Sequence, residues 1–157
     1  MLTMAEGDLL KIAKEDKLDV IVHGCNCMNT MGSGIARTIK ERYFGAYVAD
    51  MATARGDREK LGTYSSWKSE DGFTIVNAYT QYGCSTSARP DVFEYDSFGV
   101  ILSNLLEQFG GVNYGFPMIG MGLAGGDPTK ILPMIEKFSE EVELKGGRVV
   151  LVHKYIP

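Results

Sequence analysis

The chain has 157 residues, 45% of them hydrophobic and 23% charged, with a formal net charge of −4 and a pI near 5.2. This length suits one domain of ordinary globular composition. No apolar run approaches the roughly 20 residues of a membrane span, and residues 1–6 lack the features of a secretory signal, so we expect a cytoplasmic protein. The acidic balance argues against bulk nucleic-acid binding, which uses a basic stripe.

The first clear strand, residues 18–23, is a continuous apolar run of the kind that is covered on both faces of a sheet. It leads into His23 and Asn26, and the chain then enters a helix through Gly32 and Gly34. Glycines let backbone N–H groups approach a ligand, and a helix N-terminus offers unpaired donors with a partial positive charge. We therefore expect a phosphate group at this turn.

Strand-like and helix-like segments then alternate along the chain. The pattern predicts a helix marked by Ile35, Ala36, Ile39 and Tyr43, a hairpin over residues 62–77 that turns at residues 70–72, a strand at 74–79, an amphipathic helix at 98–109, a strand at 113–119, a helix that Asp127 caps and Pro128 starts, and a last strand at 149–153. Crossover helices between strands predict an α/β fold with a mixed, largely parallel sheet.

A second glycine-rich loop follows the strand at 113–119 and opens another helix. Its spacing, Gly120-x-Gly122-x-x-Gly125, also matches a dinucleotide-binding fingerprint. That fingerprint needs an acidic residue at the end of the next strand, whereas the acidic residues about 20 positions on lie within the predicted helix. We therefore reject a dehydrogenase and assign residues 119–124 to phosphate binding, because two such loops suit a diphosphate.

Three cysteines cannot all pair, and no Cys-x-x-Cys or His pair supplies further metal ligands. We expect free buried thiols, with Cys25 and Cys27 on opposite faces of an extended segment, and no structural metal or cofactor.

Gly7-Asp8-Leu9 near the N-terminus, together with the two glycine loops, resembles the macro domain family, which binds ADP-ribose. The resemblance covers nearly the whole chain and implies a single three-layer α/β/α macro domain over residues 1–157, with six or seven strands. The run His23-Gly-Cys-Asn-Cys and the run Gly32-Ser-Gly-Ile-Ala look most like the branch of the yeast ADP-ribose 1''-phosphate phosphatase. The run Gly122-Leu-Ala-Gly-Gly-Asp looks like its phage and bacterial relatives.

The resemblance implies a role for each motif. Asp8 and Leu9 hold adenine, and Asn26 fixes the distal ribose and, with His23, forms the catalytic pair, His23 acting as nucleophile or general acid. The diphosphate lies on Met31, Gly32, Ser33, Gly34, Ile35 and Ala36 and on Ile119, Gly120, Met121, Gly122, Leu123 and Ala124.

Each role has a plainer alternative. Asp8 can be a turn or helix-capping residue, His23 a hydrogen-bonded core residue, and Asn26 a residue that only holds its turn. Gln81 is placed to reach a distal phosphate, and Tyr82 or Tyr79 to stack on the ligand, although core tyrosines fit equally well. Residues 83–87 form a polar loop, and we expect His153 to be structural.

By this resemblance, the favoured function is binding of ADP-ribose and dephosphorylation of ADP-ribose 1''-phosphate, and we expect a monomer. A non-catalytic ADP-ribose-binding module and a mono-ADP-ribosyl hydrolase remain as alternatives. Many family members that release ADP-ribose from acidic side chains have an Asp where this chain has Ala36, and another branch has an Asp where this chain has Ala124. Neither hydrolase apparatus is present in its usual form.

Overall fold

The computed structural model describes residues 1–84, 88 and 92–157. The chain begins with β1 (Thr3–Gly7), α1 (Leu9–Glu15) and β2 (Val20–Cys25), and continues through α2 (Gly34–Arg42), α3 (Phe44–Met51), a 3-10 turn (Arg58–Lys60), β3 (Tyr64–Lys68), β4 (Thr74–Tyr79), α4 (Tyr95–Phe109), β5 (Asn113–Phe116), α5 (Pro128–Leu144) and β6 (Arg148–Tyr155).

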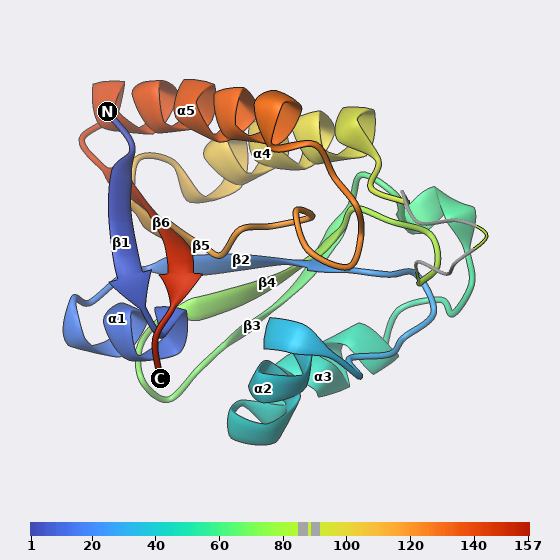
Figure 1. Cartoon of the computed structure of the whole chain (residues 1–157). Helices are drawn as coiled ribbons and strands as arrows, with labels where there is room; N and C mark the ends of the chain where they lie inside the picture. Colours follow the sequence, from blue (N-terminus) through green and yellow to red (C-terminus); the bar gives the residue numbers. More distant parts are fainter. Residues whose placement is uncertain (85–87, 89–91) are drawn as a thin grey trace.

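The strands form one six-stranded sheet in the described part of the chain, in the order β1-β6-β5-β2-β4-β3. Only the β3–β4 pair is antiparallel, and the other neighbours are parallel. Helices α4 and α5 cover one face of the sheet, and α1, α2 and α3 lie on the other (Figure 1). This is the three-layer α/β/α arrangement with a largely parallel sheet that the sequence predicts.

The core follows from the alternation of side chains along the strands. In β2, Val20 and Val22 pack under α4 and α5 with Phe98 and Ile135, while Ile21 faces the other layer with the α1 and α2 side chains. Both faces of β2 are therefore buried, as its apolar run indicates, and the strand's carboxyl end is where polar groups meet solvent.

The predicted boundaries hold closely where local signals are strong. Strand β4 and the hairpin turn lie where the sequence predicts them, and Gly72 in the turn has φ +98°. Asp127 is the N-cap of α5, as predicted, and its side chain accepts hydrogen bonds from the Thr129 N–H at 2.9 Å and from the Thr129 hydroxyl at 2.8 Å. Strand β5 ends at Phe116, before the expected end at residue 119, because Pro117 cannot donate a ladder hydrogen bond. Elements β1, α1 and α3 were not predicted.

Two expectations about the cysteines are wrong. Cys25 and Cys27 share one small buried cluster with Tyr79 instead of lying on opposite faces, because β2 ends at Cys25 and the turn that follows places Cys27 in the same cluster. All three cysteines are free, but Cys84 is exposed. Within the described ranges no helix is long and apolar enough to span a membrane. In the predicted polar loop at 83–87, residues 85–87 lie outside the described residues.

Candidate functional site

One cavity, which we call the Asp8 cavity, has a volume of about 510 Å³ and lies between the start of α1, the N-terminal half of α2 and the end of β6. Its described lining residues are Gly7, Asp8, Leu9, Leu10, Gly34, Ile35, Thr38, Pro117, Met118, Val152, His153 and Tyr155. The lining is mostly apolar, with a buried carboxylate in its wall, which is the usual make-up of a small-molecule pocket.

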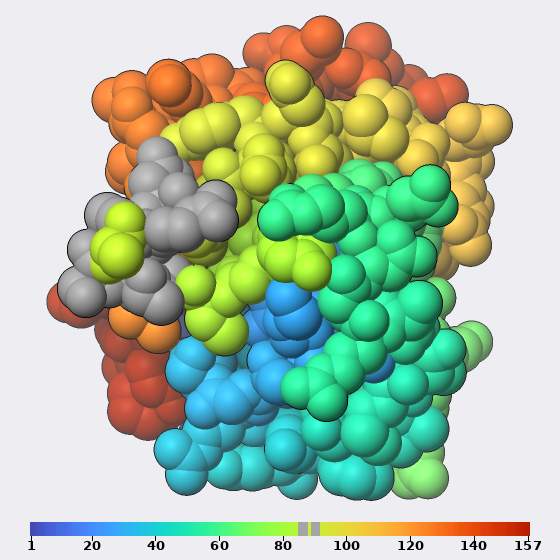
Figure 2. Space-filling model, turned by 90° about the vertical axis from the view of Figure 1, so that its right-hand side faces the viewer, coloured from blue at the N-terminus to red at the C-terminus, as the bar shows by residue number. Residues whose placement is uncertain are grey.

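A second cavity, the Asn26 cavity, has a volume of about 400 Å³ and lies at the carboxyl ends of β2 and β4. Its described lining residues are Gly24, Cys25, Asn26, Thr30, Gly32, Ser33, Ala36, Gln81, Cys84, Leu123 and Ala124. None of these carries a carboxylate, an amine or an imidazole. Figure 2 shows this end of the molecule. The segment after β2, in blue, is flanked there by α2 and α3 and by the segment that follows β4.

The N-terminal turn of α2 belongs to both cavities. Gly34, Ile35 and Thr38 line the Asp8 cavity, and Ser33 and Ala36 line the Asn26 cavity. The first N–H groups of a helix have no intrahelical partner, and the side chain of the N-cap residue Ser33 makes no capping hydrogen bond. A ligand that spans the two cavities would therefore pass the positive end of this helix.

The loop after β5 likewise touches both cavities. Pro117 and Met118 line the Asp8 cavity, and Leu123 and Ala124 line the Asn26 cavity. Between them Gly120 has φ +73°, and a Cβ there would lie 2.3 Å from the Phe93 ring. Both the backbone conformation and the close packing require glycine at this position.

Asp8 is nearly buried, and both of its carboxylate oxygens have partners. One oxygen accepts a hydrogen bond from the Leu10 N–H at 2.9 Å, which caps α1, and the other pairs with the Arg42 guanidinium at 2.9 Å. The capping role considered from the sequence is therefore present. Asp8 and Leu9 also line the cavity, where we expected adenine.

Asn26 lies in the wall of the second cavity and also organises its own turn. Its side-chain oxygen accepts from the Met28 N–H at 2.8 Å, and its amide donates to the Thr30 hydroxyl at 2.8 Å. The same amide lies 3.5 Å from the Cys84 sulfur. Asn26 can therefore hold its turn and at the same time be accessible to a ligand in the cavity.

His23 is not brought to either cavity. Its side chain is 1% exposed, and its Nε2 lies 2.7 Å from the Asn77 Oδ1, since β2 and β4 pair with His23 opposite Asn77. The Asn77 amide donates to the Ala46 carbonyl and the Ser65 hydroxyl, so its oxygen is the acceptor and Nε2 carries the ring proton. Burial lowers the pKa of His23 to about 4, and the hydrogen bond offsets only part of that shift.

This arrangement favours the structural alternative for His23 over the catalytic one. The neutral ring is held as a hydrogen-bond donor inside the layer between the sheet and α3, and its Nδ1 lies 3.9 Å from the Cys25 sulfur. Burial also raises the pKa of the Cys25 thiol, so Cys25 is protonated at neutral pH.

Some predicted ligand-binding residues do not line the cavities. The Met31 side chain is 1% exposed and packs in the core, and Ile119 is 2% exposed and packs with the α4 and α5 layer. The Tyr82 hydroxyl donates to the Gly56 carbonyl, and the Arg58 guanidinium covers its ring. Gly120, Met121 and Gly122 lie on the loop but outside the described cavity walls, whereas Gln81 lines the Asn26 cavity.

The structure adds residues that the sequence did not point to. His153 is exposed and lines the Asp8 cavity together with Tyr155, contrary to the structural role expected for it. Strand β6 runs two residues further than its apolar pattern indicates and pairs Tyr155 with Gly7 of β1. Arg42 was also missed, because its partner Asp8 lies 34 positions earlier in the chain. In the part that the structure describes, no group of three or more His, Cys, Asp or Glu side chains could hold a metal ion.

Comparison with known proteins identifies the class of fold. The macrodomain of Mycobacterium tuberculosis DarG superposes with a TM-score of 0.73 at 22% identity, covering 100% of this chain and 98% of the other. Thermosipho africanus DarTG in complex with ADP-ribose gives a TM-score of 0.72 at 18% identity, covering 99% of this chain and 41% of that longer one. The chain therefore has the macrodomain fold.

One relative is similar in sequence as well. The uncharacterized 17.5 kDa protein in the tk-vs intergenic region of Enterobacteria phage T4 is 32% identical over 148 residues, which cover 88% of this chain and 90% of the phage protein. No protein-family model matches the chain. The chain belongs to the same family as this phage protein.

Proposed function

We propose that residues 1–157 form a single, monomeric macrodomain that binds ADP-ribose, with adenine in the Asp8 cavity and the distal ribose in the Asn26 cavity. The observation that carries this proposal is the N-terminal turn of α2, whose residues line both cavities. The first N–H groups of a helix have no intrahelical partner and favour an anion. A diphosphate is the group that such a turn would hold. Thermosipho africanus DarTG, 41% of which matches this chain, is in complex with ADP-ribose, which supports ADP-ribose as the ligand.

The polar groups suit the two ends of that ligand. A carboxylate in the Asp8 cavity accepts a hydrogen bond from the exocyclic amine of adenine, while Leu9 offers a backbone contact. In the Asn26 cavity, two amides, those of Asn26 and Gln81, and two hydroxyls, those of Thr30 and Ser33, are available to donate to and accept from ribose hydroxyls.

Calorimetry with two ligands tests this proposal. AMP contains only the half of ADP-ribose that the Asp8 cavity receives. Asn26→Asp keeps the acceptor for the Met28 N–H but replaces the amide donor with a charge. The variant should weaken ADP-ribose binding by about tenfold and leave AMP binding unchanged. Equal affinity of the variant and the wild type for ADP-ribose would contradict the placement of the distal ribose.

A second candidate, by resemblance to the yeast-type phosphatase branch, is removal of the phosphate from ADP-ribose 1''-phosphate. The described lining of the Asn26 cavity holds no carboxylate that would repel a phosphate monoester, and the α2 amides favour an anion. His23 as nucleophile is the weaker part of this candidate, because the ring is buried and hydrogen-bonded away from the cavity.

Phosphate release from ADP-ribose 1''-phosphate by the wild type and His23→Gln separates the possibilities. Release by the wild type that is lost in a folded variant would assign the activity to His23. Equal release by both would assign catalysis to other groups of the cavity. Tight ADP-ribose binding without release would favour a binding module, and release of ADP-ribose from a modified macromolecule would favour a hydrolase.

A further inference from the structure

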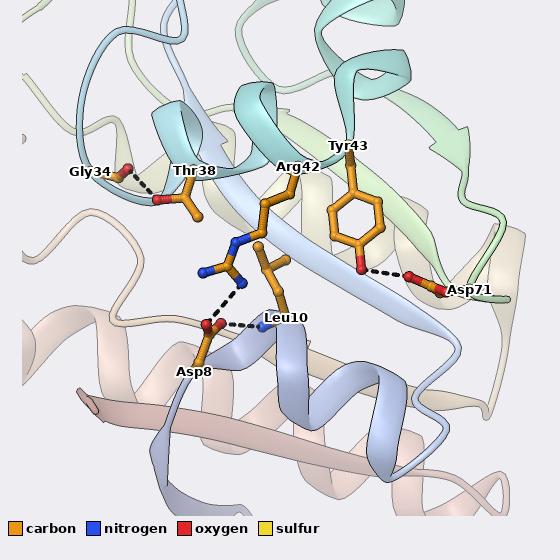
Figure 3. A network of polar contacts seen from close by, with 7 residues as sticks. All are labelled: Asp8, Leu10, Gly34, Thr38, Arg42, Tyr43 and Asp71. Atoms are coloured by element: carbon orange, nitrogen blue, oxygen red, sulfur yellow. Dashed lines mark hydrogen bonds and ion pairs between the residues drawn. The ribbon is translucent and has the colours of Figure 1, made fainter. Parts of the chain in front are cut away.

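The Arg42–Asp8 pair joins α2 and the start of α1, and residues of both elements line the Asp8 cavity. Figure 3 shows the Arg42 side chain reaching from the last turn of α2 to Asp8 at the start of α1. Thr38, one turn earlier on the same helix, lines the cavity, but Arg42 is not among the described lining residues. The guanidinium therefore holds the carboxylate from outside the space that a ligand would occupy.

The Asp8 carboxylate retains acceptor capacity toward that space. A carboxylate has about four acceptor positions, and the Leu10 N–H and the Arg42 guanidinium use one on each oxygen. The Asp8 side chain is 4% exposed and that of Arg42 41% exposed, so solvent reaches the guanidinium far more than the carboxylate. Two fixed donors on two different oxygens set the rotation of the carboxylate plane, which one donor alone would leave free.

We propose that Arg42 is a positioning residue that sets the base specificity of the Asp8 cavity by fixing the Asp8 carboxylate as an acceptor. The inference rests on the proposed binding of ADP-ribose. A fixed carboxylate accepts from the 6-amino group of adenine and repels the 6-oxo group that hypoxanthine carries at the same position. Without Arg42 the carboxylate turns away from the oxo group, and the discrimination between the two bases is lost.

The test measures affinities for ADP-ribose and for its hypoxanthine analogue, inosine diphosphate ribose, by calorimetry. Wild type should prefer ADP-ribose by roughly tenfold or more, because a polar group built to pair with an amine rejects a ligand that lacks it. Arg42→Met should reduce this ratio to within about threefold, the range of a weak hydrogen-bond preference. Arg42→Lys, which keeps the charge but not the guanidinium shape, should restore part of it.

Arg37→Met is the matched control, since Arg37 lies on the same helix, is exposed and, among the described residues, pairs with Glu41 at 3.0 Å. It should leave the ratio unchanged. If Arg42→Met weakens both ligands by one common factor, Arg42 is merely structural and the inference is overturned. If the wild type binds both ligands equally well, the inference is overturned while the proposed function stands.

If the wild type binds neither ligand, the proposed function itself fails and the inference falls with it. Should Arg42→Met fail to fold, Arg42→Lys carries the test, and an unchanged ratio in that variant overturns the inference.

Discussion

The buried imidazole of His23 makes a specific prediction about stability in acid. The pKa of His23 is lowered from 6.5 to about 4 in the folded protein, mainly by burial. The unfolded chain therefore takes up a proton between these two values while the folded chain does not. Stability from this group is complete above pH 6.5 and falls as the pH falls toward 4.

The magnitude follows from the two pKa values. At about pH 5 the linkage relation gives a loss of about 2 kcal/mol relative to neutral pH. His23→Gln replaces the ring with a group that does not titrate and still carries an N–H donor for the Asn77 oxygen. The variant should be less stable than wild type at neutral pH, because its packing is imperfect, but should lose less of its stability on acidification.

Urea unfolding of both proteins at about pH 7 and about pH 5 measures this difference. The wild type should lose about 2 kcal/mol more than His23→Gln over that interval. Carboxylates common to both proteins contribute equally and cancel in the comparison. An identical loss in the two proteins would refute the assignment of His23 as a buried neutral donor, and would reopen the case for a ring that ionises and acts in catalysis.

The remaining predictions concern the glycine-rich loop after β5 and the start of α5. Gly120→Ala should destabilise the fold by about 2–4 kcal/mol and weaken ADP-ribose binding, because Gly120 has φ +73° and an added Cβ would clash with the Phe93 ring. Urea unfolding measures the stability and calorimetry the affinity. Asp127→Ala should lower the melting temperature without changing ADP-ribose affinity, because the side chain of Asp127 caps α5 and does not line either cavity in the described part of the chain. The hydrogen bonds from Thr129 lower the pKa of Asp127, so this stabilisation is present at neutral pH and the gap between variant and wild type should narrow as the pH falls through that pKa.

Local signals in the sequence account for most of the fold. Asp127 and Pro128 predict the start of α5 because an N-cap and a first-turn proline act within a few residues. The apolar runs predict β2 and β4 because strands buried on both faces need them. Strand β1 was missed because it lies at the edge of the sheet, is partly exposed and contains no such run.

The site depends on contacts that the sequence pattern does not contain. His23 stood out in the sequence beside Asn26, yet the register of β2 against β4 turns it toward Asn77 and away from the ligand side. The pairing of Arg42 with Asp8 and the place of His153 in the Asp8 cavity depend in the same way on how distant segments pack. Residue type and local order predict a ligand class, whereas the proposed roles of individual residues depend on contacts that only the tertiary structure contains.

A crystal structure of the protein with ADP-ribose tests the central claim most directly. The account predicts the adenine 6-amino group within hydrogen-bond distance of Asp8, the diphosphate at the N–H groups of Gly34 and Ile35, and the distal ribose beside Asn26. Adenine in the Asn26 cavity, or a diphosphate away from the start of α2, would contradict it.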